Sequence, residues 1–267
     1  MTANMPYKGQ HTAKLPSSKV WGQFPLKNAL ARLGGEASLG NCADVGSLAG
    51  AAEGVDVNSP VVRFCESATG DLDIDRTDGH PALLWTPAAD ENLVVGPDFN
   101  FDLGAGRPWA FECRIKQTTA TEHGWVAGLA SVNSAADATY DVYQAAKVVT
   151  DTSTLVTNRS IIGFHKHEAV APVNAITKDR GTADAAETVV LATAHTLVDA
   201  TYVKLGMYSD GSRIRFFVDN VEKASHAMGG AGIPSNTFDG NMAPMFYAVG
   251  NGTSTVFVQW VAAGYLV

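Results

Sequence analysis

Apolar and polar residues alternate in two runs between Tyr202 and Asn220, and a Ser-Asp-Gly-Ser turn joins the runs. The apolar positions that share one face are Val203, Leu205, Met207, Ile214, Phe216 and Val218. A period of two predicts a β-hairpin with one core face and one outer face. Asp210-Gly211 suits the first tight turn, and Asp219-Asn220 begins a second turn before residues 221–224. The stretch is therefore predicted to be an antiparallel meander.

Comparable strand signals recur from Val61 to the end of the sequence. They lie at residues 61–67, 82–86, 92–96, 108–117, 124–132, 160–167, 187–194, 242–250 and 254–267. Ten or more short strands separated by polar turns predict an all-β fold, a two-sheet antiparallel β-sandwich over residues 61–267. Residues 1–60 are expected to form an N-terminal arm and a loop-rich extension, with one or two helical turns at 26–33. Residues 135–149 fit neither pattern clearly.

Charge is divided unevenly along the chain. Residues 1–35 carry five basic and no acidic residues, whereas the remainder carries 14 basic and 27 acidic residues, a net charge of −13. Without a basic cluster in the body of the chain, we expect no nucleic-acid partner. The basic segment is either an ordinary solvated terminus or an arm that docks on an acidic neighbouring subunit. The candidate arm residues are Lys8, Lys14, Lys19, Trp21, Phe24, Lys27 and Arg32.

Trp21 and Phe24 form an aromatic pair within this basic segment. Two interpretations stay open, since such a pair either anchors the arm in a pocket on a neighbour or packs back on its own sandwich. Cys42, Cys65 and Cys113 form no disulfide framework or metal-binding spacing, which suits assembly in a reducing cytoplasm. The sequence contains no apolar run long enough for a membrane span and no secretory signal, so we expect no membrane partner.

A family resemblance rests on four segments in order: "PWAFECRIKQ", "GWVAGLASV", "YVKLGMYSDGSRIRFFVDNVEKA" and "MAPMFYAVGNGTSTVFVQWVAAGYLV". Together they resemble the concanavalin A-like lectin/glucanase jelly roll, which is laminin-G-like. More narrowly, they resemble the version of this fold in structural proteins of tailed-phage virions. The resemblance covers residues 61–267, and Gln259 stands where the last motif often has an acid. It implies a β-sandwich but does not fix a function.

Glucanase members of this group carry closely spaced acids on one strand as nucleophile and acid/base. The segment 108–117 offers only Glu112. We therefore expect no enzyme activity, and the absence of phosphate-binding and dinucleotide motifs predicts no cofactor.

Two groups of residues have side chains that could bind a metal ion. Asp71, Asp73 and Asp75 begin like a calcium loop, but Arg76 and Ala82 occupy the positions that need glycine and a bidentate acid. A solvated acidic turn is favoured there, with a weakly held cation as the alternative. His165 and His167 share one side of a strand, but no neighbour in the sequence completes a metal shell, so a polar outer face is expected.

Three functions from different classes follow. The favoured one is a non-enzymatic virion structural protein, a capsid decoration (cement) protein on the head. It would be assembled in the host cytoplasm, be trimeric, and contact the major capsid protein and sibling subunits through its arm. The alternative is a carbohydrate-binding or receptor-binding tail module that stacks surface glycans on Tyr140, Tyr143, Tyr208 and Phe217. The third is a glycoside hydrolase of glucanase type, against which the missing acid cluster argues.

Overall fold

The computed structural model describes residues 20, 29–34, 63–66, 71–75, 82–87, 92–96, 101–103, 106–131, 155, 159–180, 187–234 and 241–266. Within these ranges the chain is almost entirely strand and turn. No helix among them is long and apolar enough to cross a membrane.

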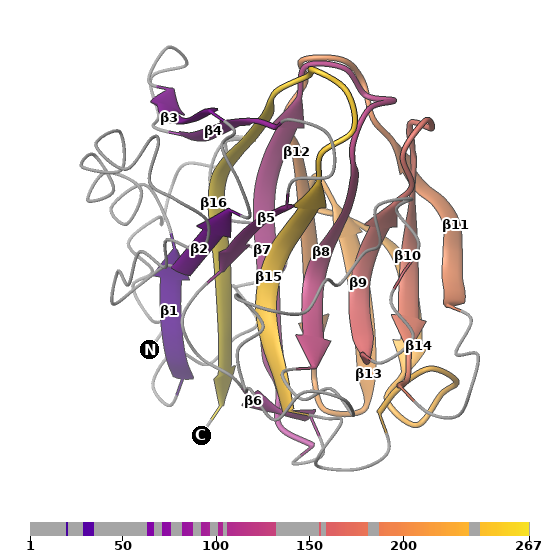
Figure 1. Cartoon of the computed structure of the whole chain (residues 1–267). Coiled ribbons are helices and arrows are strands. Elements are labelled where there is room, and N and C mark those ends of the chain that lie inside the picture. Colours follow the sequence, from indigo (N-terminus) through magenta and orange to yellow (C-terminus); the bar gives the residue numbers. More distant parts are fainter. Residues whose placement is uncertain are drawn as a thin grey trace.

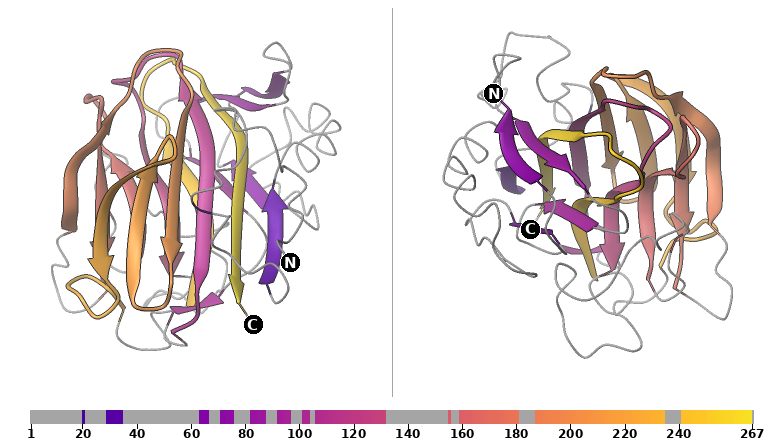
Figure 2. Two further views of the ribbon diagram at one scale, coloured as in Figure 1. Left: turned by 180° about the vertical axis from the view of Figure 1, so that it is seen from behind. Right: turned by 45° about the horizontal axis from the view of Figure 1, so that its top comes forward.

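One layer of the molecule, sheet A, has eight antiparallel strands. In spatial order these are β14 (Val221–Ala227), β13 (Arg213–Val218), β12 (Val203–Ser209), β7 (Trp109–Gln117), β16 (Val256–Leu266), β4 (Ala82–Thr86) and β3 (Asp71–Asp75). The eighth strand, β1 (Ala29–Gly34), also pairs with β16. Seen from behind, β1 lies beside the C-terminal half of β16 (Figure 2, left).

The second layer, sheet B, also has eight antiparallel strands. Its order is β11 (Thr188–Thr196), β10 (Pro172–Lys178), β9 (Ile161–Lys166), β8 (Gly124–Ser131), β15 (Asn241–Val249), β5 (Asn92–Gly96) and β2 (Arg63–Glu66). The short β6 (Phe101–Asp102) pairs with the start of β15. Figure 1 shows sheet B in front of sheet A. The predicted two-sheet antiparallel sandwich is confirmed.

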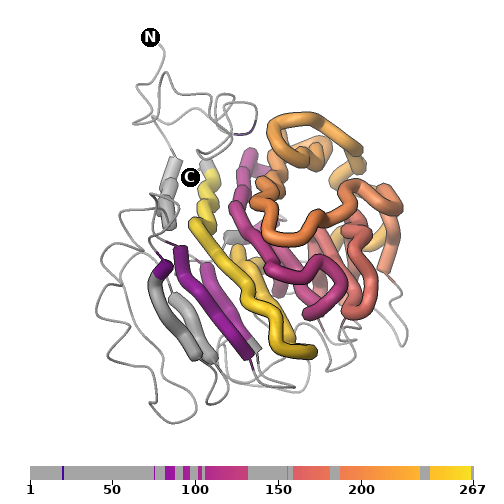
Figure 3. The backbone as a smooth tube through the Cα atoms, turned by 90° about the horizontal axis from the view of Figure 1, so that it is seen from above, coloured from indigo at the N-terminus to yellow at the C-terminus, as the bar shows by residue number. Residues whose placement is uncertain are grey.

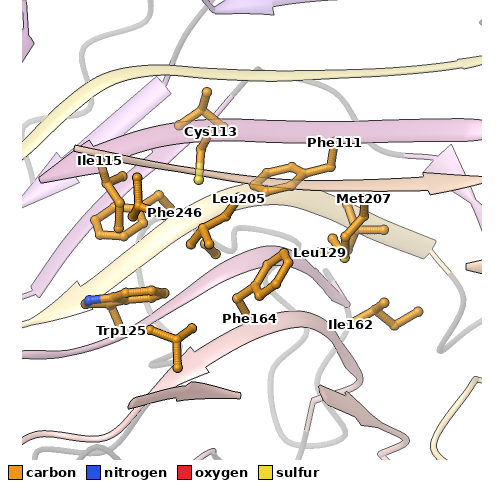
Figure 4. Packing of buried hydrophobic residues seen from close by; sticks show 14 of the residues in the cluster. Phe111, Cys113, Ile115, Trp125, Leu129, Ile162, Phe164, Leu205, Met207 and Phe246 are labelled. Carbon is orange, nitrogen blue, oxygen red and sulfur yellow. The ribbon is translucent and has the colours of Figure 1, made fainter. Parts of the chain in front are cut away.

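The main core fills the space between the two sheets (Figure 4). Phe164 of sheet B meets Phe216 of sheet A edge to face, with ring centroids 5.6 Å apart. Trp125 is fully buried, and its ring centroid lies 5.8 Å from that of Phe246. Its indole N–H donates a hydrogen bond to Oε1 of Gln117 at 2.8 Å. Large rings in these arrangements supply much of the burial that stabilises a sandwich of this size.

The structure confirms the predicted meander, both in how its strands pair and in which side chains face the core. Leu205 pairs with Val218 and Met207 with Phe216, and all four side chains lie in the core. The first turn differs in detail, because only Gly211 takes a positive φ there, whereas Asp210 accepts N–H hydrogen bonds from Ser212 and Arg213. The second turn has positive φ at both Asp219 and Asn220, as a tight hairpin requires. Viewed from above, β13 and β14 lie on the opposite side of the molecule from β4 (Figure 3).

Three local predictions were wrong or incomplete. The helical turns expected at 26–33 are replaced by β1, because the edge of β16 offers unpaired backbone groups that outweigh a weak helical preference. The acidic turn expected at 71–75 is the strand β3, paired with β4. Strand β10 was missed, since Pro172 and the polar Asn174 interrupt its apolar pattern. Residues 135–149 lie outside the described residues.

Candidate functional site

The outer face of sheet A carries both apolar and charged side chains. They come from alternate positions whose neighbours fill the core: Ala110, Glu112, Arg114, Lys116, Lys204, Gly206, Tyr208, Phe217, Trp260 and Ala262. Gly206 lies at the centre, since its register partners are Glu112 on β7 and Phe217 on β13. We call this set the sheet A outer face.

A residue of the N-terminal segment occupies the apolar half of this face. Val20 is fully buried in a cluster with five residues of the sheet, which we call the Val20 seat: Ala110, Tyr208, Phe217, Trp260 and Ala262. A Cβ added to Gly206 would lie 2.9 Å from Cγ2 of Val20 and 3.3 Å from Cγ of Glu112. Glycine at this strand position therefore makes room for the docked valine.

The described parts of the N-terminal segment thus contact the sandwich of the same chain: Val20 through its seat and β1 through β16. Several candidate arm residues lie outside the described residues, namely Lys8, Lys14, Lys19, Trp21, Phe24 and Lys27. Arg32 lies in β1, where only the backbone is described. Contacts of these residues with a partner stay a prediction.

A charged row adjoins the Val20 seat. Arg114 donates to Oε1 of Gln259, and both side chains are buried. Lys204 is also buried, and its Nζ donates to Asn220 Oδ1 at 2.8 Å. Burial lowers the pKa of Lys204, while the negative charges of Glu112 and Asp219 act in the opposite direction. These hydrogen bonds fix the Arg114 and Lys204 side chains in place on the sheet A outer face.

Cation–π contacts extend the charged row toward one end of the sheet. The guanidinium carbon of Arg114 lies 3.9 Å from the centroid of the Tyr202 ring. Nζ of Lys116 lies 4.7 Å from the same ring centroid and 4.0 Å from that of Phe257. These contacts stabilise the two cations against the faces of aromatic rings.

The described positions directly beside Glu112 on the sheet hold no carboxylate. Along β7 the adjacent outer positions are Ala110 and Arg114, and across the strands its register partners are Gly206 and Ala262. The paired acids of a glucanase would need a second carboxylate facing the same sugar ring. Among the described strands that flank β7, the sheet does not place one beside Glu112.

The aromatic residues proposed for glycan stacking are less accessible than expected. Tyr208 is 7% exposed and Phe217 is 4% exposed, because both pack in the cluster that holds Val20. The expectation that these two rings are exposed was wrong. Tyr140 and Tyr143 lie outside the described residues.

A second group of polar residues gathers at one corner of sheet B. Nδ1 of His165 lies 2.7 Å from Oε2 of Glu187, and Nε2 of His167 lies 3.9 Å from Oε1 of the same carboxylate. Burial raises the pKa of Glu187, but hydrogen bonds from His165 and His167 outweigh it and bring the pKa to about 2. The predicted polar outer face is wrong for His165, which is buried, and Glu187 contacts both histidines from a distant part of the sequence. The candidate acids Asp71, Asp73 and Asp75 lie on β3, and a cation there stays a prediction.

The loops at one end of the sandwich are tied together by buried polar groups. Nζ of Lys166 donates to the carbonyls of Glu122 at 2.6 Å, His123 at 2.6 Å and His167 at 3.0 Å. Nδ1 of His123 accepts a hydrogen bond from the backbone N–H of Asn251. Its Nε2 therefore carries the ring hydrogen, which it donates to the carbonyl of Ser254. Burial lowers the pKa of both His123 and Lys166, the latter to about 7. With their polar atoms satisfied by the protein itself, these groups have a structural role.

Comparisons with known proteins give likeness in fold only. No protein-family model matches the chain, and no curated protein sequence matches it. Arcelin-5, a lectin-like defense protein from Phaseolus vulgaris, is similar at 10% identity and TM-score 0.48, covering 79% of this chain and 95% of arcelin-5.

Two further solved structures show likeness of the same order. A glycoside hydrolase family 16 endo-glucanase from Bacteroides ovatus is 13% identical with TM-score 0.46, covering 71% of this chain and 84% of the glucanase. A carbohydrate esterase from the Shiga toxin-encoding bacteriophage phi24B is 11% identical with TM-score 0.44, covering 76% and 90% of the two chains. Likeness at this level assigns no ligand, reaction or partner to the present chain.

Proposed function

We propose that this chain is a non-enzymatic structural protein of a tailed-phage virion. Specifically, it is a capsid decoration protein that attaches to the head through its N-terminal segment and associates with sibling subunits as a trimer. The observation that carries the proposal is the Val20 seat, where a face of the sandwich holds an apolar residue of the basic N-terminal segment. We call this segment, residues 1–35, the basic leader. The narrow family resemblance of residues 61–267 supports the virion setting.

The seat makes exchange of the leader between copies chemically simple. Every copy of the chain presents the same apolar cluster beside the same glycine, so a sibling's Val20 would find the contacts that it makes in its own subunit. Exchange of an identical element is a low-cost route to an oligomer. The leader is therefore suited to bind either its own sandwich or that of a neighbour.

The division of charge favours the same behaviour. Residues 1–35 carry five positive charges, whereas the rest of the chain carries a net charge of −13. Opposite charges on two parts of identical chains attract leader to body between subunits as well as within one. An acidic patch on a capsid subunit would attract the leader for the same reason. The charged part of the attachment should weaken as salt rises.

The outer face of sheet A gives the competing functions less support. Hydrolysis would need a second acid beside Glu112, and the adjacent described positions hold Ala110, Arg114, Gly206 and Ala262. Glycan stacking on Tyr208 or Phe217 would require Val20 to leave its seat. We therefore rank attachment above both.

Charge reversal in the leader is expected to reduce head binding. Heads made without this protein are mixed with the purified chain, and the bound fraction is measured by co-sedimentation. The double variant Lys8→Glu/Lys14→Glu should bind heads at least about ten-fold more weakly, because two attractions between the leader and the head become repulsions. The matched control is Arg213→Glu/Lys223→Glu, which reverses two exposed charges on β13 and β14 outside the Val20 seat.

The control variant should bind heads as the unchanged chain does. Equal binding by the leader variant and the unchanged chain would rule out attachment through the basic leader. Failure of the unchanged chain to bind heads at all would count against the decoration function itself. Removal of residues 1–35 is a poor test, because it also deletes β1 and exposes an edge of β16.

A further inference from the structure

Three potential metal ligands come together from three places in sheet B. His165 lies near the end of β9, His167 follows that strand directly, and Glu187 immediately precedes β11. Strand β10 lies between β9 and β11, so the cluster joins two strands that do not pair with each other. One ligand atom from each side chain lies within 4.8 Å of the others.

We propose that His165, His167 and Glu187 form a Zn²⁺ site. The nitrogens that face the Glu187 carboxylate, and so would be the ligand atoms beside one of its oxygens, are Nδ1 of His165 and Nε2 of His167. Two imidazoles and one carboxylate match the nitrogen and oxygen ligands that zinc accepts in sites with three protein ligands. Calcium and magnesium prefer shells made of oxygen, so this mixed set disfavours them.

The distances suit insertion of an ion with little movement. Zinc-to-ligand bonds of about 2.0–2.2 Å at tetrahedral angles place neighbouring ligand atoms about 3.3–3.6 Å apart. The observed separations join different carboxylate oxygens of Glu187: 2.7 Å from Oε2 to Nδ1 of His165, and 3.9 Å from Oε1 to Nε2 of His167. Rotation of the partly exposed Glu187 and His167 side chains would have to bring the ligand atoms from within 4.8 Å of one another to this spacing. The two imidazole rings already lie close together, with centroids 4.1 Å apart.

Burial decreases across the cluster from one ligand to the next. The His165 side chain is fully buried, that of Glu187 is 21% exposed, and that of His167 is 43% exposed. His165 is fixed in the sheet, where its register partners are Val126 on β8 and Asn174 on β10. An ion would enter from the His167 side and keep a fourth position open to water, as in sites with three protein ligands.

The expected consequence is a fastening at the edge of sheet B. Strand β11 is the outermost strand, and Val189 on it is exposed. An ion bound by Glu187 and the two histidines connects the beginning of β11 to the end of β9 across β10. Because an ion that binds only the folded chain stabilises it, zinc should raise the melting temperature. The site does not depend on where the protein works.

Isothermal titration calorimetry with Zn²⁺ tests the site directly. The full chain, free of added histidine tags and stripped of metal with a chelator, should bind one zinc ion per chain, and an excess of Ca²⁺ should not displace it. His167→Ala and Glu187→Gln should each weaken zinc binding by about ten-fold or more, because each removes a ligand. His226→Gln is the matched control, since His226 lies on β14 and its Nε2 contacts the carbonyl of Ala231.

A second readout separates loss of the site from loss of the fold. Circular dichroism without metal should be the same for all variants, and zinc should raise the melting temperature of the unchanged chain and of His226→Gln alone. Co²⁺ in place of zinc should give the visible absorption of a tetrahedral site only in those two proteins. Absence of stoichiometric zinc binding, or binding of equal strength by His167→Ala and Glu187→Gln, would overturn the proposal.

Discussion

Lys166→Met is expected to lower the free energy of unfolding by about 3–5 kcal/mol. The ammonium group donates to three backbone carbonyls, those of Glu122, His123 and His167, and the side chain is fully buried. Methionine fills a similar volume but donates no hydrogen bond. A buried carbonyl left without a donor, such as that of His123, costs about 1–3 kcal/mol. The part-buried carbonyl of His167 loses its bond to Lys166 as well, whereas that of Glu122 still accepts a hydrogen bond from Nε2 of Gln117. The loss is shared by the β7–β8 loop and the turn after β9, which this lysine ties together.

Urea unfolding followed by tryptophan fluorescence measures the effect. Lys223→Met is the control, because Lys223 is exposed on β14 and surface substitutions usually change stability by less than about 0.5 kcal/mol. The two variants should differ by several kcal/mol at equal slope of the unfolding transition. Equal stability of the two variants would mean that the three carbonyls do not depend on Lys166.

Gly128→Ala is expected to destabilise the fold by about 3 kcal/mol through overpacking. Gly128 of β8 pairs with Gly163 of β9. An added Cβ would lie 2.6 Å from Cα of Gly163 and would also meet the carbonyl oxygen of Ile162. Both are backbone atoms, so no side-chain rotation relieves the contact. The two strands would have to separate at the middle of sheet B.

Thermal unfolding of Gly128→Ala is compared with that of Gly229→Ala. An added Cβ at Gly229 meets nothing within 4 Å, and its φ is not in the left-handed region. The control should therefore be unchanged or slightly more stable, since alanine reduces the freedom of the unfolded chain. A Gly128→Ala protein that melts with the control would show that the two strands lie farther apart than described.

Local patterns made most of the sandwich predictable. The β12–β13 hairpin could be read from alternation and turn residues, because its facing and register depend on contacts close in sequence. Strand β1 could not, since its six residues gain their conformation from β16, more than 200 residues further along the chain. Strand β10 was missed because its core positions are few and its outer positions are polar.

The sites were harder to predict than the fold for the same reason. Glu187 precedes β11, and β11 belongs beside β9 only through β10, which pairs with both strands. Because β10 was not predicted, the contact between Glu187 and His165 was not predicted either. A lone valine in a basic leader carries no pattern that predicts burial. Its seat did leave one signal, namely Gly206 between Lys204 and Tyr208 on the outer face of a strand, where a glycine often marks close approach by another segment.

Quantitative mass spectrometry of purified virions tests the central claim most directly. The measurement is the copy number of this chain relative to the major capsid protein in intact particles. Decoration of the head predicts hundreds of copies per particle, in a fixed ratio to the capsid subunits and in multiples of three, as expected for a trimer bound to a symmetric shell. A handful of copies would place the chain in the tail, and its absence from particles would contradict a structural role in the virion.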